Sequence, residues 1–177
     1  MAYIIQRATS RDAVPWRNGR GVQYEVCADG PLPDGWSWRL STADLSVDVP
    51  FSDFSGVDRE FCVAVGNGVD LMIDGMSTRC GPGSITRFDG GSVVHASLID
   101  GPTKDINLMV RQGSPAKHLS SHVAGDRITG VVALLALAGG ARLSIDNHII
   151  ELEPLDGVLD LGTEVIDLAQ GLIVALQ

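Results

Sequence analysis

Four polar residues have spacings that would place them in pairs on the faces of strands. Arg39 and Ser41 are two positions apart, so an extended chain points both side chains the same way. Asn107 and Arg111, four positions apart, share a face for the same reason. A guanidinium binds a carboxylate through two parallel hydrogen bonds, and an amide supplies both a donor and an acceptor. These residue types in this pattern predict a pocket for a small carboxylic acid or amide.

Two further candidates lie in loops that contain glycine. Asn18 belongs to the tight turn Trp16–Gly21, and Arg59 ends the aromatic loop Phe51–Arg59. Each also has a purely structural interpretation, in which Asn18 caps its own turn and Arg59 pairs with a neighbouring aspartate, Asp58 or Asp89. Arg39 could likewise pair with Asp44. The six candidate ligand-binding residues are Asn18, Arg39, Ser41, Arg59, Asn107 and Arg111.

Common catalytic motifs are absent from the sequence. There is no Gly-x-Ser-x-Gly elbow, no phosphate-binding Gly-x-x-x-x-Gly-Lys-Ser/Thr loop and no Gly-x-Gly-x-x-Gly. The four histidines include no His-x-His pair, and His118 and His122 lack the glutamate of a zinc-protease helix. A solvated face is the simpler interpretation of this pair, although a metal site is possible. We therefore expect no metal and no cofactor.

An enzyme is the main alternative to a binding protein. It would be an isomerase, lyase or hydrolase that acts on a small acid, with Glu25, Asp105 or His95 as the general base. An enzyme of this kind could use a metal held by clustered histidines, and this sequence has no such cluster. We therefore expect a binding protein rather than a catalyst.

The elements that must position these residues are short strands. The 21 glycines and 8 prolines punctuate the chain too often for helices of ordinary length, which favours an all-β sandwich or barrel. Val69–Asp74 and Leu143–Asp146 alternate in polarity and end at turn residues. Only residues 9–12 and 115–124 could form short helices.

An internal repeat divides the chain into two β units. A shift of 72 residues aligns seven identical residues between 64 and 90 with their counterparts in the second half, at turns and inward strand positions. We expect a first module of about residues 1–113 and a second of about 126–177, packed as one globule. Val131–Ala138 is apolar on both faces, so it must be buried inside a sandwich or against a second copy, which leaves a homodimer possible.

Composition excludes several classes of partner. The chain has 177 residues with 13 Lys and Arg against 22 Asp and Glu, a net charge of −9, so we expect no nucleic acid and no anionic membrane as a partner. The N-terminus lacks a signal-peptide pattern, and the three cysteines form no Cys-x-x-Cys pair. We therefore expect a cytoplasmic protein.

Several segments, in this order, resemble the HutD/Ves family of bicupin proteins. They are Trp16–Gly21 with Glu25, Trp38–Ser41, Pro50–Arg59, Phe88–Gly90, Gly101–Pro102 and Asp105–Arg111. The resemblance covers about residues 3–115, and the second half resembles the family only as a second cupin-like β unit.

This resemblance implies a double cupin fold of two tandem antiparallel β units. It also implies a protein that binds a small acid, N-formylglutamate or formate, and moderates the expression of histidine utilisation. The pocket would then lie among the six polar residues of the first module. The chain departs from the family pattern at Arg20, Val22 and Gln23, where glycines and then threonines are usual, and at Gln112, where a second arginine is common. These departures redistribute charge around any anion site.

Overall fold

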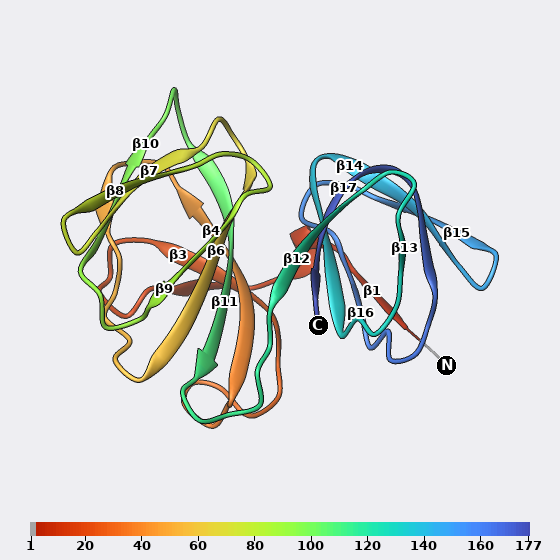
Figure 1. The fold of residues 1–177 in the computed structure, drawn as a ribbon, viewed down its shortest axis with the longest axis horizontal. Coiled ribbons are helices and arrows are strands. Elements are labelled where there is room, and N and C mark those ends of the chain that lie inside the picture. Colours follow the sequence, from red (N-terminus) through yellow and green to blue (C-terminus); the bar gives the residue numbers. More distant parts are fainter. Residues whose placement is uncertain (1–2) are drawn as a thin grey trace. The chain divides into compact units, whose positions relative to one another are not determined.

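The computed structural model describes residues 3–177 and is built almost entirely from antiparallel strands (Figure 1). Its single helix among these residues is the 3-10 turn η1 (Ala8–Ser10), so none of the described helices is long and apolar enough to cross a membrane. The chain forms two compact units, one of Asp12–Lys117 and one of His118–Gln177 with the chain up to Arg11. The all-β expectation is confirmed.

The Asp12–Lys117 unit consists of two sheets, one of six strands and one of four. In spatial order, the six-stranded sheet contains β2 (Ala13–Pro15), β3 (Val22–Ala28), β4 (Trp38–Leu45), β11 (Thr103–Arg111), β6 (Val57–Val65) and β9 (Ile85–Asp89). The four-stranded sheet contains β5 (Val49–Pro50), β10 (Val94–Leu98), β7 (Val69–Ile73) and β8 (Met76–Cys80).

The core of this unit lies between its two sheets. Phe61 and Val63 of the six-stranded sheet pack with Leu71 and Ala96 of the four-stranded sheet, and all four side chains are fully buried. This apolar packing fixes which face of β4, β6 and β11 points inward, because alternate residues of a strand lie on opposite faces.

The second unit contains one seven-stranded sheet. Its strands are β1 (Ile4–Gln6), β16 (Gly157–Leu159), β14 (Ala133–Ile145), β17 (Ile166–Leu176) and β12 (Leu119–Val123), with β13 (Arg127–Ile128) beside β17 and β15 (His148–Leu152) beside β14. Leu134 and Ala136 belong to its apolar core, while Leu135 and Leu137 on the other face of β14 are also buried. This run is therefore buried on both faces within the single chain.

The 72-residue repeat relates equivalent hairpins of the two units. In β7 and β8, Ile73 pairs with Met76 across a two-residue turn, and in β14 and β15 Ile145 pairs with His148. Both turns have two residues with positive φ, Asp74-Gly75 and Asp146-Asn147, which is the geometry of the tight hairpin turns that match strand twist. The repeated turn residues therefore preserve a backbone conformation.

Two segments differ from their sequence-based expectations. Residues 115–124 contain strand β12 rather than a helix, because this segment pairs with β17 from Leu119 to Val123. The N-terminal residues belong to the second unit rather than the first, because β1 pairs with β16.

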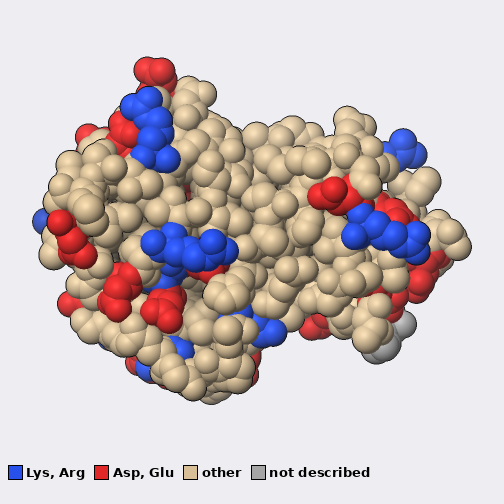
Figure 2. Space-filling view, viewed as in Figure 1, with Lys and Arg blue, Asp and Glu red and all other residues tan. Residues whose placement is uncertain are grey.

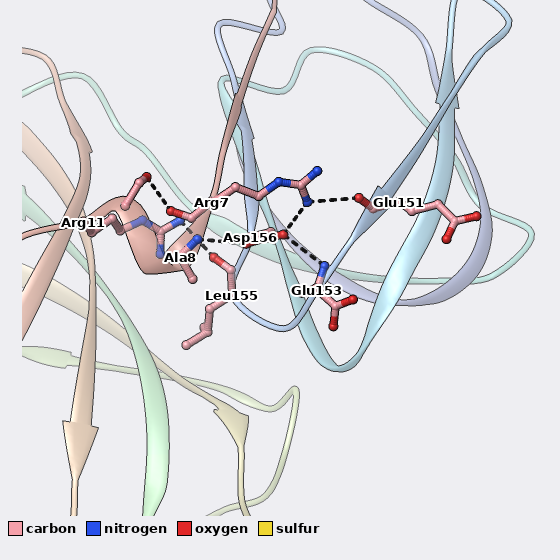
Figure 3. Close-up of polar contacts among 8 residues, drawn as sticks. Arg7, Ala8, Arg11, Glu151, Glu153, Leu155 and Asp156 are labelled. Atoms are coloured by element: carbon pink, nitrogen blue, oxygen red, sulfur yellow. Dashed lines mark hydrogen bonds and ion pairs between the residues drawn. The ribbon is translucent and has the colours of Figure 1, made fainter.

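Asp156 holds this N-terminal segment in place (Figure 3). Its buried carboxylate accepts hydrogen bonds from the Arg7 side chain at 2.6 Å and from the Ala8 backbone N–H at 2.8 Å. Arg11 donates to the carbonyl oxygen of Leu155 at 2.9 Å. The residues that follow β1 are therefore hydrogen-bonded to the turn before β16.

Charged side chains of both signs are interspersed on the face drawn in Figure 2. Basic and acidic groups alternate there in small clusters, and no continuous basic area covers this face.

Candidate ligand-binding site

Strand register brings the predicted polar residues onto the inner face of the six-stranded sheet. Directly opposed residues on antiparallel neighbours point to the same face, so each cross-strand row can be followed from β4 through β11 to β6. The three successive rows are Arg39, Met109 and Arg59; Ser41, Asn107 and Phe61; and Ala43, Asp105 and Val63.

A pocket of about 450 Å³, including its open mouth, lies on this face. Its polar lining comes from Arg17, Gln23, Ser41, Ser52, Arg59, Asp105 and Asn107, and its apolar lining from Trp16, Ala43, Leu45, Phe51, Phe54, Phe61 and Met109. Apolar walls with a few convergent polar groups are typical of a small-molecule site.

Arg59 is the central charged group of the pocket. It is 5% exposed, and it donates hydrogen bonds to Asn107 Oδ1 at 2.7 Å and to the carbonyl oxygen of Ser52 at 3.4 Å. Its Nε is buried and has no hydrogen-bond partner among the described residues. Burial, together with the smaller effect of the positive charge of Arg39, lowers the pKa of Arg59 to about 9. The negative charge of an anion bound here would compensate the positive charge of Arg59.

Aromatic rings surround the Arg59 guanidinium. Its Cζ lies 5.0 Å from the ring centre of Phe51, 5.8 Å from that of Phe54 and 5.1 Å from that of Phe88. Rings at these distances attract a cation and exclude water. They hold the guanidinium in position without occupying the hydrogen-bonding edge that a carboxylate would use.

Asp105 provides a carboxyl group two residues along β11 from Asn107. It is fully buried, and its Oδ2 accepts a hydrogen bond from the Thr103 hydroxyl at 3.1 Å, whereas its Oδ1 has no partner among residues 3–177. Burial raises the pKa of Asp105 to about 8; the Thr103 hydrogen bond opposes this shift and the charge of Asp44 adds to it. The group is therefore mostly a neutral carboxylic acid at pH 7.

Arg39 lies on the same face but outside the pocket lining. Its Nε lies 3.8 Å from Glu25 Oε1, and its guanidinium lies 5.5 Å from the ring centre of Trp36. The suggested pair with Asp44 does not form, because residues 39 and 44 lie on opposite faces of β4; Lys104 Nζ binds the Asp44 carboxylate at 2.7 Å. Arg39 acts on the pocket through its charge.

Two candidates have structural roles instead. Arg111 donates to the carbonyl oxygens of Trp36 and Asp34, both at 2.8 Å, and so fixes the loop before β4. Asn18 donates to the carbonyl oxygen of Pro50 at 3.1 Å, and its Oδ1 accepts the backbone N–H of Arg20 at 3.0 Å. The structure therefore brings Ser41, Arg59 and Asn107 together at the pocket and leaves Asn18, Arg39 and Arg111 outside its lining.

Several pocket residues were not among the six sequence candidates. Gln23 lines the pocket from β3, where strand register places it opposite Ala43 in the row that contains Asp105. Asp105 was considered only as a general base. Trp16 and Arg17 reach the pocket from the glycine-flanked turn, for which strand alternation gives no signal.

The remaining candidate bases and metal ligands lie elsewhere. His95 is exposed on β10, and Glu25 is half-buried beside Arg39, where burial raises its pKa and the Arg39 charge opposes the shift. His122 on β12 lies 2.9 Å from Ser120 Oγ and 3.4 Å from Asp126 Oδ2. Among residues 3–177, no three His, Cys, Asp or Glu side chains are grouped as metal ligands.

The family model named HutD matches residues 8–171, nearly the whole chain. The chain belongs to the HutD family. A Pseudomonas putida protein described as an uncharacterized 21.2 kDa protein in the hutC 3′ region is 38% identical over 107 residues, covering 59% of this chain and 56% of that protein. Protein Ves of Citrobacter koseri is 34% identical over 104 residues, covering 55% and 52%. These matches span about half the length of each curated relative.

Solved structures extend the similarity over the full chain. HutD from Pseudomonas fluorescens, described with a formate condition, has a TM-score of 0.81 and 26% identity, covering 99% of this chain and 98% of that one. A conserved Pseudomonas aeruginosa protein of unknown function has a TM-score of 0.84 and 26% identity, covering 100% and 98%. Salicylate 1,2-dioxygenase from Pseudoaminobacter salicylatoxidans, at TM-score 0.64 and 9% identity over 99% of this chain and 80% of that one, shares the fold alone. The HutD-family chain thus has the expected double cupin fold.

Proposed function

We propose that this HutD-family chain is a metal-free protein that binds a small carboxylate in the pocket of the Asp12–Lys117 unit. The observation that carries this proposal is the buried guanidinium of Arg59, which lines the pocket and pairs with no carboxylate among residues 3–177. Burying an unpaired charge is costly, and a ligand carboxylate would offset that cost. Asn107 and Ser41 supply further hydrogen-bonding groups beside it.

The expected affinity is that of a metabolite sensor. Each hydrogen bond to a charged group contributes about 1.5–3 kcal/mol. Two or three of these, less the cost of association, correspond to dissociation constants of roughly micromolar to millimolar.

N-formylglutamate and formate are the proposed ligands, and moderation of histidine utilisation is the proposed role. Support comes from membership of the HutD family, from a relative described by its place beside hutC, and from a similar structure described with a formate condition. An amino-acid derivative of this kind carries a carboxylate for Arg59, which lines the pocket.

Calorimetric titration of metal-stripped protein tests this function. The panel comprises N-formylglutamate, formate, urocanate, glutamate and histidine, and the ligand is recovered afterwards and checked for chemical change. We expect saturable one-to-one binding with unchanged ligand. Conversion of the ligand would indicate an enzyme, and the absence of binding by every member would contradict the proposal.

Replacing Arg59 with alanine should weaken binding at least tenfold. The variant removes the charge that a ligand carboxylate would contact, and a tenfold change corresponds to about 1.4 kcal/mol, less than one charge-assisted hydrogen bond. Arg79→Ala is the matched control, because Arg79 is exposed and pairs with Asp70 away from the pocket. Thermal unfolding verifies that both variants fold. Unchanged affinity in Arg59→Ala would remove Arg59 from the site.

A further inference from the structure

The pocket presents two different polar ends. The first is the hydrogen-bonded pair of Arg59 and Asn107, and the second is Asp105, one cross-strand row further along β11. Successive residues on one face of a strand are about 7 Å apart. A ligand with a single carboxylate reaches one of these ends, whereas a ligand with a second oxygen acceptor at a distance of several ångströms can reach both.

One carboxyl oxygen of Asp105 accepts a hydrogen bond, and the other has no hydrogen-bond partner among the described residues. Oδ2 accepts the Thr103 hydroxyl, and Oδ1 is buried on the pocket lining without a partner among the described residues. A neutral carboxyl satisfies this geometry when Oδ2 is the acceptor and Oδ1 carries the proton, because that proton then needs an acceptor that none of the described residues supplies. An ionised Asp105 would instead repel an acid.

We propose that Asp105 binds the ligand as a neutral acid, donating a hydrogen bond to a second oxygen of a molecule whose carboxylate lies on Arg59 and Asn107. The ligand class is then a two-ended small acid, such as an N-acyl amino acid or a dicarboxylic acid, rather than a one-ended acid. This inference rests on the proposed function of the same pocket. It adds that the bound complex holds a proton on Asp105.

The surrounding groups support a neutral Asp105. On the six-stranded sheet, the charge of Asp44 disfavours a further negative charge on Asp105, whereas Glu25, Arg39 and Arg59 lie in other rows. The neighbouring thiols of Cys62 and Cys80 are also buried, and burial is the main reason that the pKa of each is raised, so both add no charge beside Asp105. From the four-stranded sheet, β7 and β10 contribute apolar side chains to the adjoining core, so burial dominates.

Proton uptake is therefore the decisive measurement. N-formyl-L-glutamate and glutarate are titrated into the wild-type protein at pH 6.5 and pH 8.5, in two buffers with different heats of ionisation. With a pKa of about 8, roughly a quarter of Asp105 holds its proton at pH 8.5, so we expect Asp105 to take up about three quarters of a proton per ligand and the affinity to be about fourfold weaker than at pH 6.5. At pH 6.5 we expect almost no uptake.

The Asp105→Asn variant distinguishes the titration of Asp105 from that of Arg59, which also loses its charge at high pH. The amide keeps an acceptor for Thr103 and a donor for the ligand, so the variant should bind as tightly as the wild type at pH 6.5 and about fourfold more tightly at pH 8.5. Identical pH profiles of wild type and variant, or binding without proton uptake, would overturn the inference and leave the proposed function standing. Failure of both two-ended acids to bind overturns the inference, and if formate fails as well the proposed function falls with it.

Discussion

Asp156 illustrates how a single carboxylate organises the second unit. Burial alone would raise its pKa, but hydrogen bonds from the Ala8 backbone, the Arg7 side chain and the Glu153 backbone outweigh burial and lower the pKa below its usual value. The anion is therefore stabilised by folding, in contrast to Asp105, where burial dominates and the neutral form is favoured. The charge of a buried acid therefore depends on whether its hydrogen-bond donors are numerous enough to outweigh the effect of burial.

Asp156→Asn should lower the free energy of unfolding by about 2–3 kcal/mol at pH 7, because charge-assisted hydrogen bonds become neutral ones. The folded-state pKa is depressed, so this contribution is present above the unfolded pKa of about 4 and disappears as the pH falls further. Urea denaturation at pH 7 and pH 3 measures it. The exposed Asp167→Asn is the control, and a difference between wild type and Asp156→Asn that does not shrink at low pH would contradict the assignment.

Strand β14 shows what backbone conformation contributes at the scale of an element. It pairs with β17 on both sides of a register shift between Ala136 and Ala141, and both glycines within that shift have positive φ, 86° at Gly139 and 72° at Gly140. Gly140 also lies against the backbone of β15, since a Cβ there would meet the carbonyl oxygen of Leu152. The bulge allows one long strand to serve two strand pairings.

Replacing these glycines one at a time should separate conformational strain from steric contact. Gly139→Ala has open space around its Cβ, so it should lower the free energy of unfolding by about 1–2 kcal/mol, the cost of a positive φ. Gly140→Ala should cost roughly twice as much, because the β15 backbone must also move. Chemical denaturation of both variants measures the difference. Equal losses would mean that contact with Leu152 has no energetic effect.

At the scale of the whole molecule, the chain is not divided at a single point. The first residues pair with β16, and the compact unit they join resumes at His118, so Asp12–Lys117 is an insertion between two parts of one unit. The residues that line the pocket all belong to this inserted unit, and the aliphatic second unit contributes none of them.

Removing residues 1–11 should selectively loosen the second unit. The deletion takes away β1 and the donors from Arg7 and Ala8, which leaves the buried Asp156 carboxylate with fewer partners. Hydrogen exchange should show faster exchange of backbone amides in β14, β16 and β17, with little change in β4, β6 and β11. Equal acceleration in both units would show that the N-terminal segment does not belong to the second unit alone.

The sequence by itself determined the fold class, the repeat and the shared faces of the site strands. Glycine and proline frequency, turn residues and period-two alternation are local properties, so the pairing of Arg39 with Ser41 on one face follows from the covalent chain. Asn107 and Arg111 lie on one face for the same reason, although only Asn107 reaches the pocket.

Tertiary structure alone decided which of these residues form the site. Strand register sets Arg59 opposite Met109. Asp58 and Asp89, the partners that the sequence suggested for Arg59, bind Gln112 instead. Arg59 therefore has no carboxylate partner among residues 3–177. The neutral state of Asp105 depends on burial by residues distant in the chain. Hydrogen bonding and burial depend on contacts between segments far apart in sequence, so local patterns could not assign them.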